Sequence, residues 1–131
     1  MANPPIRGFR DLIVWQRGMQ LLDECEVLAE KLHARRRYVT SNQLLRAALS
    51  VPSNIAEGQG RISKPDNVRH LAMARGSLFE VITVLASKSV RSLSATECDR
   101  AETLADEVGR MLTTLIRRLG TRSLNRVVIS D

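Results

Sequence analysis

Apolar residues recur along this chain at steps of three and four positions, with polar residues between them. One apolar stripe in the first segment consists of Leu12, Trp15, Met19 and Leu22. This spacing is typical of helices that bury one side, and no segment alternates in the manner of a half-buried strand. The pattern predicts helices over about residues 11–33, 41–58, 64–91 and 95–119.

Capping residues mark the expected starts of these helices. Thr40 and Gln43 form a capping box for the second helix, and Ser94 and Glu97 form another for the fourth. Ser63 precedes the third helix and is expected to cap it, because a hydroxyl at this position accepts a hydrogen bond from a first-turn N–H. The boundaries therefore support the helices that the periodicity predicts.

Proline and glycine modify two of these helices. Pro52 lies inside the second helix, where we expect a kink because proline removes one backbone hydrogen bond. Gly120 is expected to end the fourth helix, leaving residues 121–131 as a basic tail. Four such helices joined by short links predict an all-α protein, an antiparallel up-and-down four-helix bundle, with residues 1–131 forming one domain.

Composition narrows the class further. No apolar run approaches the length of a membrane span, and the first residues lack the apolar core of a secretory signal, so we expect a cytoplasmic protein. Cys25 and Cys98 lack the close spacing of zinc or redox motifs and are expected to be reduced. His33 and His70 stand singly and are interpreted as surface or linker residues, so we expect no metal and no cofactor.

The chain is basic, with a net charge of +6 and 17 arginines among its 20 basic residues. Such a charge attracts nucleic acid, although arginine enrichment also reflects GC-rich codon usage. Aromatic residues make up 3% of the chain, so we expect phosphate contacts to lead any binding. The candidate nucleic-acid residues are Arg35, Arg36, Arg37, Arg61, Lys64, Arg117, Arg118 and Arg122. The first three should lie at one end of the bundle and the others at the opposite end; solvated faces are the competing interpretation.

The third helix is apolar on nearly every side between Leu78 and Leu85. An outer helix of a monomeric bundle should keep one solvated face. We therefore expect the chain to self-associate through Phe79, Ile82 and Val84, although a central position of this helix would also explain the pattern.

Several polar residues fall near the expected core. Arg75 lies on an apolar stripe of the third helix, so its stem should run inside the bundle or its interface and need a carboxylate partner. Glu57 and Glu80 are the candidates, and Asn54 is expected to bond backbone groups near Pro52. We interpret these four residues as a structural polar network and expect no enzymatic activity, because acid–base catalysis also needs a substrate pocket.

Two segments resemble a known family. They are Ser50-Val51-Pro52-Ser53-Asn54-Ile55-Ala56-Glu57-Gly58-Gln59-Gly60-Arg61 and Ala74-Arg75-Gly76-Ser77-Leu78-Phe79-Glu80. The start Phe9-Arg10-Asp11-Leu12-Ile13-Val14-Trp15-Gln16 and the segment Glu107-Val108-Gly109-Arg110-Met111-Leu112 are similar too. The chain resembles the bacterial intervening-sequence proteins, some of which are encoded within insertions in large-subunit ribosomal RNA genes.

This resemblance implies an antiparallel four-helix bundle that assembles into a ring-like homopentamer. It also implies kinship with the accessory variability determinant of diversity-generating retroelements, a basic pentamer that binds a reverse transcriptase and nucleic acid. The sequence departs from the family pattern at Leu45, where arginine is common, and at Ile82 and Val84, where polar residues are common. These departures favour an interface over nucleic-acid binding at those positions.

Together these features predict a non-enzymatic, homo-oligomeric scaffold, pentameric by resemblance, whose basic surface binds RNA or other nucleic acid without sequence preference. The alternative is a protein–protein interaction adaptor with no nucleic-acid role, in which the charge serves solubility.

Overall fold

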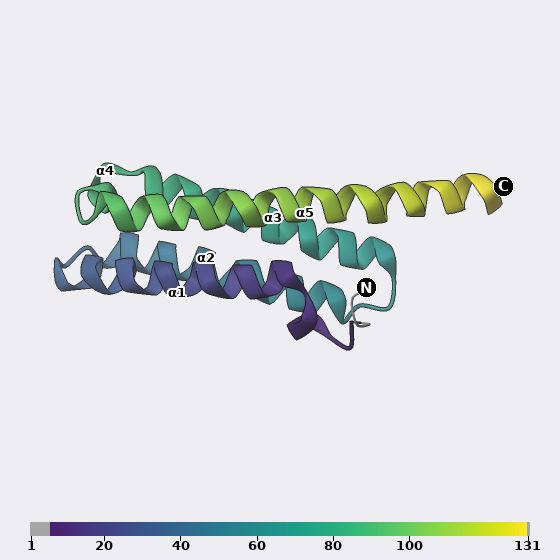
Figure 1. Cartoon of the computed structure of the whole chain (residues 1–131), viewed down its shortest axis with the longest axis horizontal. Coiled ribbons are helices and arrows are strands. Elements are labelled where there is room, and N and C mark those ends of the chain that lie inside the picture. The colour runs from purple at the N-terminus through teal and green to yellow at the C-terminus, as the bar shows by residue number, and fades with distance from the viewer. Residues whose placement is uncertain (1–5, 131) are drawn as a thin grey trace, which may run out of the picture.

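Four long antiparallel helices form the molecule (Figure 1). The structure, a computed structural model, describes residues 6–130, with side chains described as far as Gly120. Its elements are η1 (Phe9–Asp11), α1 (Ile13–Ala34), α2 (Tyr38–Gln59), α3 (Lys64–Ala86), α4 (Lys88–Arg91) and α5 (Ala95–Ser130). The described residues contain no strand, which confirms the all-α bundle. None of these helices is both long and apolar enough to span a membrane.

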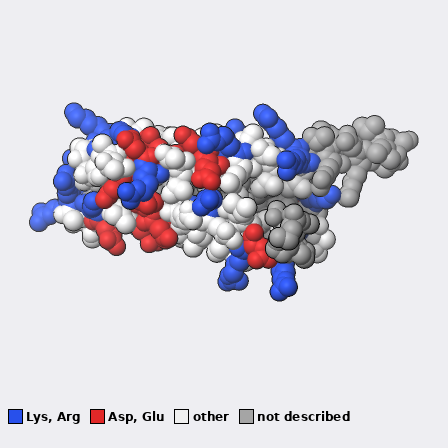
Figure 2. Space-filling view, viewed as in Figure 1, with Lys and Arg blue, Asp and Glu red and all other residues white. Residues whose placement is uncertain are grey.

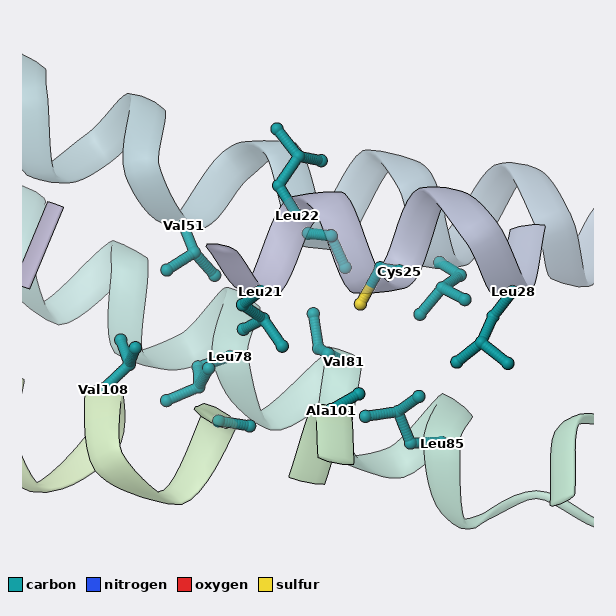
Figure 3. Close-up of a cluster of buried hydrophobic side chains, with 14 of the residues drawn as sticks. Leu21, Leu22, Cys25, Leu28, Val51, Leu78, Val81, Leu85, Ala101 and Val108 are labelled. Atoms are coloured by element: carbon teal, nitrogen blue, oxygen red, sulfur yellow. The ribbon is translucent and has the colours of Figure 1, made fainter. Parts of the chain in front are cut away.

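Each long helix packs against two neighbours and turns one apolar stripe towards the bundle axis. α1 lies against α2 and α5, and α3 lies against the same two helices, so the four helices form a closed square. Figure 3 shows Leu21 and Cys25 of α1 meeting Leu78 and Val81 of α3, with Val108 of α5 close by. All five side chains are excluded from solvent. These residues are part of the hydrophobic core of the chain.

α2 and α3 pack closely at Gly58. A Cβ atom at this position would lie 2.7 Å from Asn67 Oδ1, 3.1 Å from His70 Cβ and 3.2 Å from the Asn67 carbonyl oxygen. The first distance is shorter than real Cβ atoms show, and the second and third are tighter than most real Cβ contacts. The third distance involves a backbone atom. A side chain at position 58 would therefore require Asn67 to move and α3 to shift slightly.

Two of the three expected helix caps are present. Ser63 Oγ accepts a hydrogen bond from the Asp66 N–H at 3.3 Å, and Ser94 Oγ accepts one from the Glu97 N–H at 3.2 Å. The Glu97 carboxylate does not complete the capping box; it accepts from Lys31 Nζ at 2.7 Å instead. The Glu97 carboxylate, which was expected to cap its own helix, thus joins α5 to α1.

The capping box at Thr40 was wrong. α2 begins at Tyr38, so Thr40 lies inside its first turn, and Arg37 at the N-cap position makes no capping bond through its side chain. α2 is continuous through Pro52, which lies buried inside the helix. The bend expected at Pro52 stays a prediction.

The ends of the third and fourth helices also differ from expectation. α3 stops at Ala86 because Ser87 adopts an extended conformation, with φ −67° and ψ 147°, and donates from its hydroxyl to the Val84 carbonyl. Residues up to Arg91 form the separate short helix α4. α5 continues past Gly120 to Ser130, so the tail expected from residue 121 is helical as far as the structure describes it.

We predict opposite effects for two glycine-to-alanine substitutions. Gly58→Ala should lower the free energy of unfolding by about 1–3 kcal/mol, because the added methyl group meets α3 backbone. Gly76→Ala, in an α3 position with nothing within 4 Å of the added atom, should raise it by about 0.5–1 kcal/mol. Urea unfolding followed by circular dichroism measures both. Two equal shifts would contradict the packing requirement at Gly58.

Candidate functional site

The link between α1 and α2 is a tight turn made of three arginines. The Arg36 N–H donates to the His33 carbonyl and the Arg37 N–H donates to the Leu32 carbonyl, both at 2.9 Å. This pair of bonds defines a Schellman motif, whose left-handed position is usually occupied by glycine. Arg36 occupies it here, with φ 62°. The left-handed conformation costs an L-residue about 1 kcal/mol, so a bulky charged side chain is held at a strained position.

Charged and aromatic side chains gather around this turn, which we call the arginine tip (residues 33–38). Arg35, Arg36 and Arg37 are exposed, and none forms an ion pair with a carboxylate among the described residues. The rings of His33 and Tyr38 meet edge to face, with centroids 4.7 Å apart. Three solvated cations therefore lie beside an exposed aromatic pair, a combination that the low aromatic content did not predict.

The other candidate basic residues lie at the opposite end of the bundle, as the helix directions require. Arg61 is exposed in the α2–α3 link, and Lys64 begins α3. Arg117 and Arg118 are exposed near the end of the described part of α5, and the side chain of Arg122 lies outside the described side chains. On the face shown in Figure 2, acidic side chains gather mainly over the body of the bundle, between basic groups at its ends.

The expected polar network is only partly present. Asn54 is buried and Glu57 is near it, but Arg75 and Glu80 are exposed on the outer side of α3. The Arg75 guanidinium lies over the ring of Phe79, 5.0 Å from its centroid. Burial of Arg75 within the bundle was therefore wrong, because Ala74, the preceding residue, takes the inward position.

A different polar cluster lies between α2 and α3 and consists of Ser50, Asn54, Glu57, His70 and Ser77. Asn54 Nδ2 donates to the Ser50 carbonyl at 2.9 Å and to Ser50 Oγ at 3.0 Å, and Ser50 Oγ contacts Ser77 Oγ at 2.8 Å. His70 Nδ1 lies 3.2 Å from Asn54 Oδ1 and 3.4 Å from Glu57 Oε2. This cluster joins the two helices by hydrogen bonds.

The hydrogen bonds also assign the tautomer of His70. Asn54 donates through its amide nitrogen, so its Oδ1 faces the imidazole as an acceptor. Nδ1 must therefore carry the proton. Nε2 is buried and has no partner among the described residues. His70 was expected at the surface, whereas it is 4% exposed and belongs to the packing between α2 and α3.

The spacing of these residues is the signal that could have identified the cluster. Ser50, Asn54 and Glu57 follow one another at four- and three-residue steps on α2, and His70 and Ser77 are seven residues apart on α3. Positions with this spacing lie on one side of a helix. Polar residues that share a side facing another helix point to a buried hydrogen-bonded contact.

Two of the three candidate interface residues of α3, Phe79 and Ile82, line a groove. Phe79 is 50% exposed, while Ile82 and Val84 are half-buried against the core. A groove of about 430 Å³ runs between α3 and α5, with Phe79 and Ile82 among its apolar lining and Arg110 and Arg117 among its polar lining. Phe79 therefore gives this side of the bundle an exposed apolar centre.

A larger groove lies between α1 and α5 near the start of the chain. It encloses about 870 Å³ and is lined by Ile6, Leu12, Met111 and Leu115 together with Arg7 and Arg118. Asp11 lies at the same place, where its carboxylate accepts from the Arg7 backbone N–H at 2.8 Å. Both grooves are open to solvent, and the described residues that line them include no set of converging catalytic groups.

Burial lowers the reactivity of the two cysteines, Cys25 and Cys98. Burial raises the pKa of the Cys25 thiol to about 12, and burial also raises the pKa of Cys98. Both thiols therefore stay protonated near neutral pH, and the reactive thiolate is suppressed. No group of three or more histidine, cysteine or acidic residues in the described part of the chain could hold a metal ion.

Comparison with known families gives one match. The model of a family described as 23S rRNA-intervening sequence protein matches residues 10–114. That range contains all of η1 except Phe9, all of α1 to α4 and the greater part of α5, including the arginine tip and the polar cluster. A comparison with individually curated proteins finds no match.

We predict that the polar cluster contributes to stability. Asn54→Ala should lower the free energy of unfolding by about 1–3 kcal/mol, because it leaves the His70 and Ser50 polar groups without their partner. Asn42→Ala, at an exposed position of α2, is the matched control and should change it by less than about 0.5 kcal/mol. If both substitutions have the same effect in urea unfolding, the cluster has no special role.

Proposed function

Because the chain belongs to the 23S rRNA-intervening sequence protein family, we propose that it is a non-enzymatic, homo-oligomeric scaffold that binds RNA or other nucleic acid in the bacterial cytoplasm. The observation that carries nucleic-acid binding is the arginine tip. Three consecutive arginines project from one turn there, and no carboxylate among the described residues neutralises them. A guanidinium donates two hydrogen bonds to a phosphate, so this turn suits a polyanion.

The conformation of Arg36 supports the same assignment. Strained backbone positions are enriched at functional sites. A glycine at residue 36 would relieve about 1 kcal/mol of strain, whereas arginine adds a third cation beside Arg35 and Arg37. The turn therefore favours charge at the tip over the stability of the link.

Self-association is the second part of the proposal. Phe79 exposes half of its surface in the middle of α3, next to a groove with an apolar floor. Burial of this ring against a second copy removes apolar surface from water. The family resemblance suggests a ring of five chains and kinship with accessory variability determinants, and both stay proposals. In such a ring each arginine tip is repeated five times, so weak phosphate contacts gain avidity.

The alternative function, a protein–protein adaptor, draws on the same apolar groove. In that case Phe79 would bind another protein, and the basic ends would serve solubility. The unpaired arginines of the tip favour the nucleic-acid scaffold, because solubility requires neither three consecutive cations nor a strained one.

We predict that phosphate binding depends on the tip. Replacing Arg35 and Arg37 by glutamine should weaken binding to a labelled 20-nucleotide RNA roughly tenfold at low salt and lower the slope of log K against log salt by about 1.4. Fluorescence anisotropy measures both quantities. The control, Arg46→Gln with Arg69→Gln, removes the same charge from exposed positions on the sides of α2 and α3 and should have a smaller effect. Absence of binding by the unmodified chain would reject the nucleic-acid role.

We predict that assembly depends on Phe79. Light scattering of the unmodified chain at micromolar concentration should give the mass of several 14.6 kDa subunits, and five if the ring forms. Phe79→Glu should shift this mass towards a single subunit, because a charge replaces the apolar centre of the contact. Ile62→Glu introduces the same charge at a fully exposed apolar residue of the α2–α3 link and should leave the mass unchanged. A single-subunit mass for the unmodified chain would contradict self-association.

A further inference from the structure

We propose that Tyr38 stacks against an unpaired base, so that the arginine tip selects single-stranded over double-stranded nucleic acid. This inference rests on the proposed nucleic-acid function. It adds a contact to the base, which the arginines do not provide because they bind phosphate. Tyr38 is the first residue of α2 and directly follows Arg37. Its side chain is 48% exposed, although burial of an aromatic ring is energetically favourable.

The other aromatic rings lie outside the arginine tip. The chain has four aromatic residues of the Phe, Trp and Tyr types. Phe9 and Trp15 contact one another near the start of the chain, with ring centroids 5.2 Å apart, and Phe79 lies in α3 beside the Arg75 guanidinium. In the described part of the chain, no cation lies over the ring of Tyr38. Tyr38 is thus the ring that combines exposure with a position beside three unpaired arginines.

His33 acts as a positioning residue for this ring. Its imidazole meets Tyr38 at an interplanar angle of 68°, which is an edge-to-face contact. Such a contact covers at most one face of the tyrosine and fixes its orientation. The ring is held between the end of α1 and the start of α2, and part of its surface stays open to solvent beside the arginine tip.

The combination of a ring and adjacent cations distinguishes single strands from duplexes. A base in a duplex is paired and already stacked on its neighbours, whereas an unpaired base can lie on an aromatic side chain. The arginines bind the phosphates on either side without reading the sequence. Because every base has an aromatic face, the tip should accept all sequences with a preference for strongly stacking purines.

The test compares three labelled probes of equal length: a 12-nucleotide oligo(A) RNA, the same strand paired with oligo(U), and an abasic strand that carries phosphates without bases. Anisotropy at fixed low salt should show the tightest binding to oligo(A). Tyr38→Leu should weaken binding to oligo(A) about 5- to 100-fold and leave the abasic and duplex probes within about twofold. Tyr38→Phe keeps the ring and should retain the affinity within about threefold.

Val39→Ala, at the neighbouring exposed position, is the control and should leave all three affinities unchanged. Circular dichroism verifies that each variant is helical. If Tyr38→Leu binds oligo(A) as tightly as the unmodified chain while the Arg35 and Arg37 double variant loses affinity, base stacking is rejected and the phosphate-binding function stands. If the unmodified chain binds none of the probes, both the stacking and the proposed function are rejected.

Discussion

Burial of one apolar stripe from each of four long helices is the interaction on which the rest of this structure depends. All four helices contribute to one core, through Leu21 and Cys25 of α1, Val51 of α2, Leu78 of α3 and Val108 of α5. Burial at this scale fixes the rotation of every helix about its own axis, because turning any one of them by one residue would expose its stripe. The packing of the core therefore also determines which side chains are exposed to solvent.

The helices could be predicted from the sequence because their apolar spacing is regular, but the rotation of α3 could not. Two overlapping stripes fit that segment, one through Arg75 and one through Ala74. The structure uses the second, with Ala74 buried and Arg75 exposed on the outer side of α3. The same rotation buries His70, which in isolation resembles a surface histidine.

Local hydrogen-bond chemistry explains the remaining differences. The break after Ala86 accompanies a bond from the Ser87 hydroxyl to the Val84 carbonyl, and a serine in the sequence does not by itself show whether its hydroxyl will make such a bond. Gly120 does not end α5, because glycine weakens a helix without preventing it. For the candidate site, the cluster of three arginines was visible in the sequence, but the left-handed Arg36 and the ring contact of Tyr38 depend on the exact geometry of the turn.

The order of the helices around the square has a consequence for how the chain folds and opens. α1 and α2, and likewise α2 and α3, are neighbours in sequence and can pair quickly after short loop closures. Contacts between α1 and α5 instead join residues far apart, with Arg17 and Glu107 separated by 90 positions and Lys31 and Glu97 by 66. Closing this longest loop carries the largest entropic cost, so we expect the contact between α1 and α5 to form after the pairs of neighbouring helices and to open before them. The two ion pairs that cross it are partly exposed and contribute little against that cost.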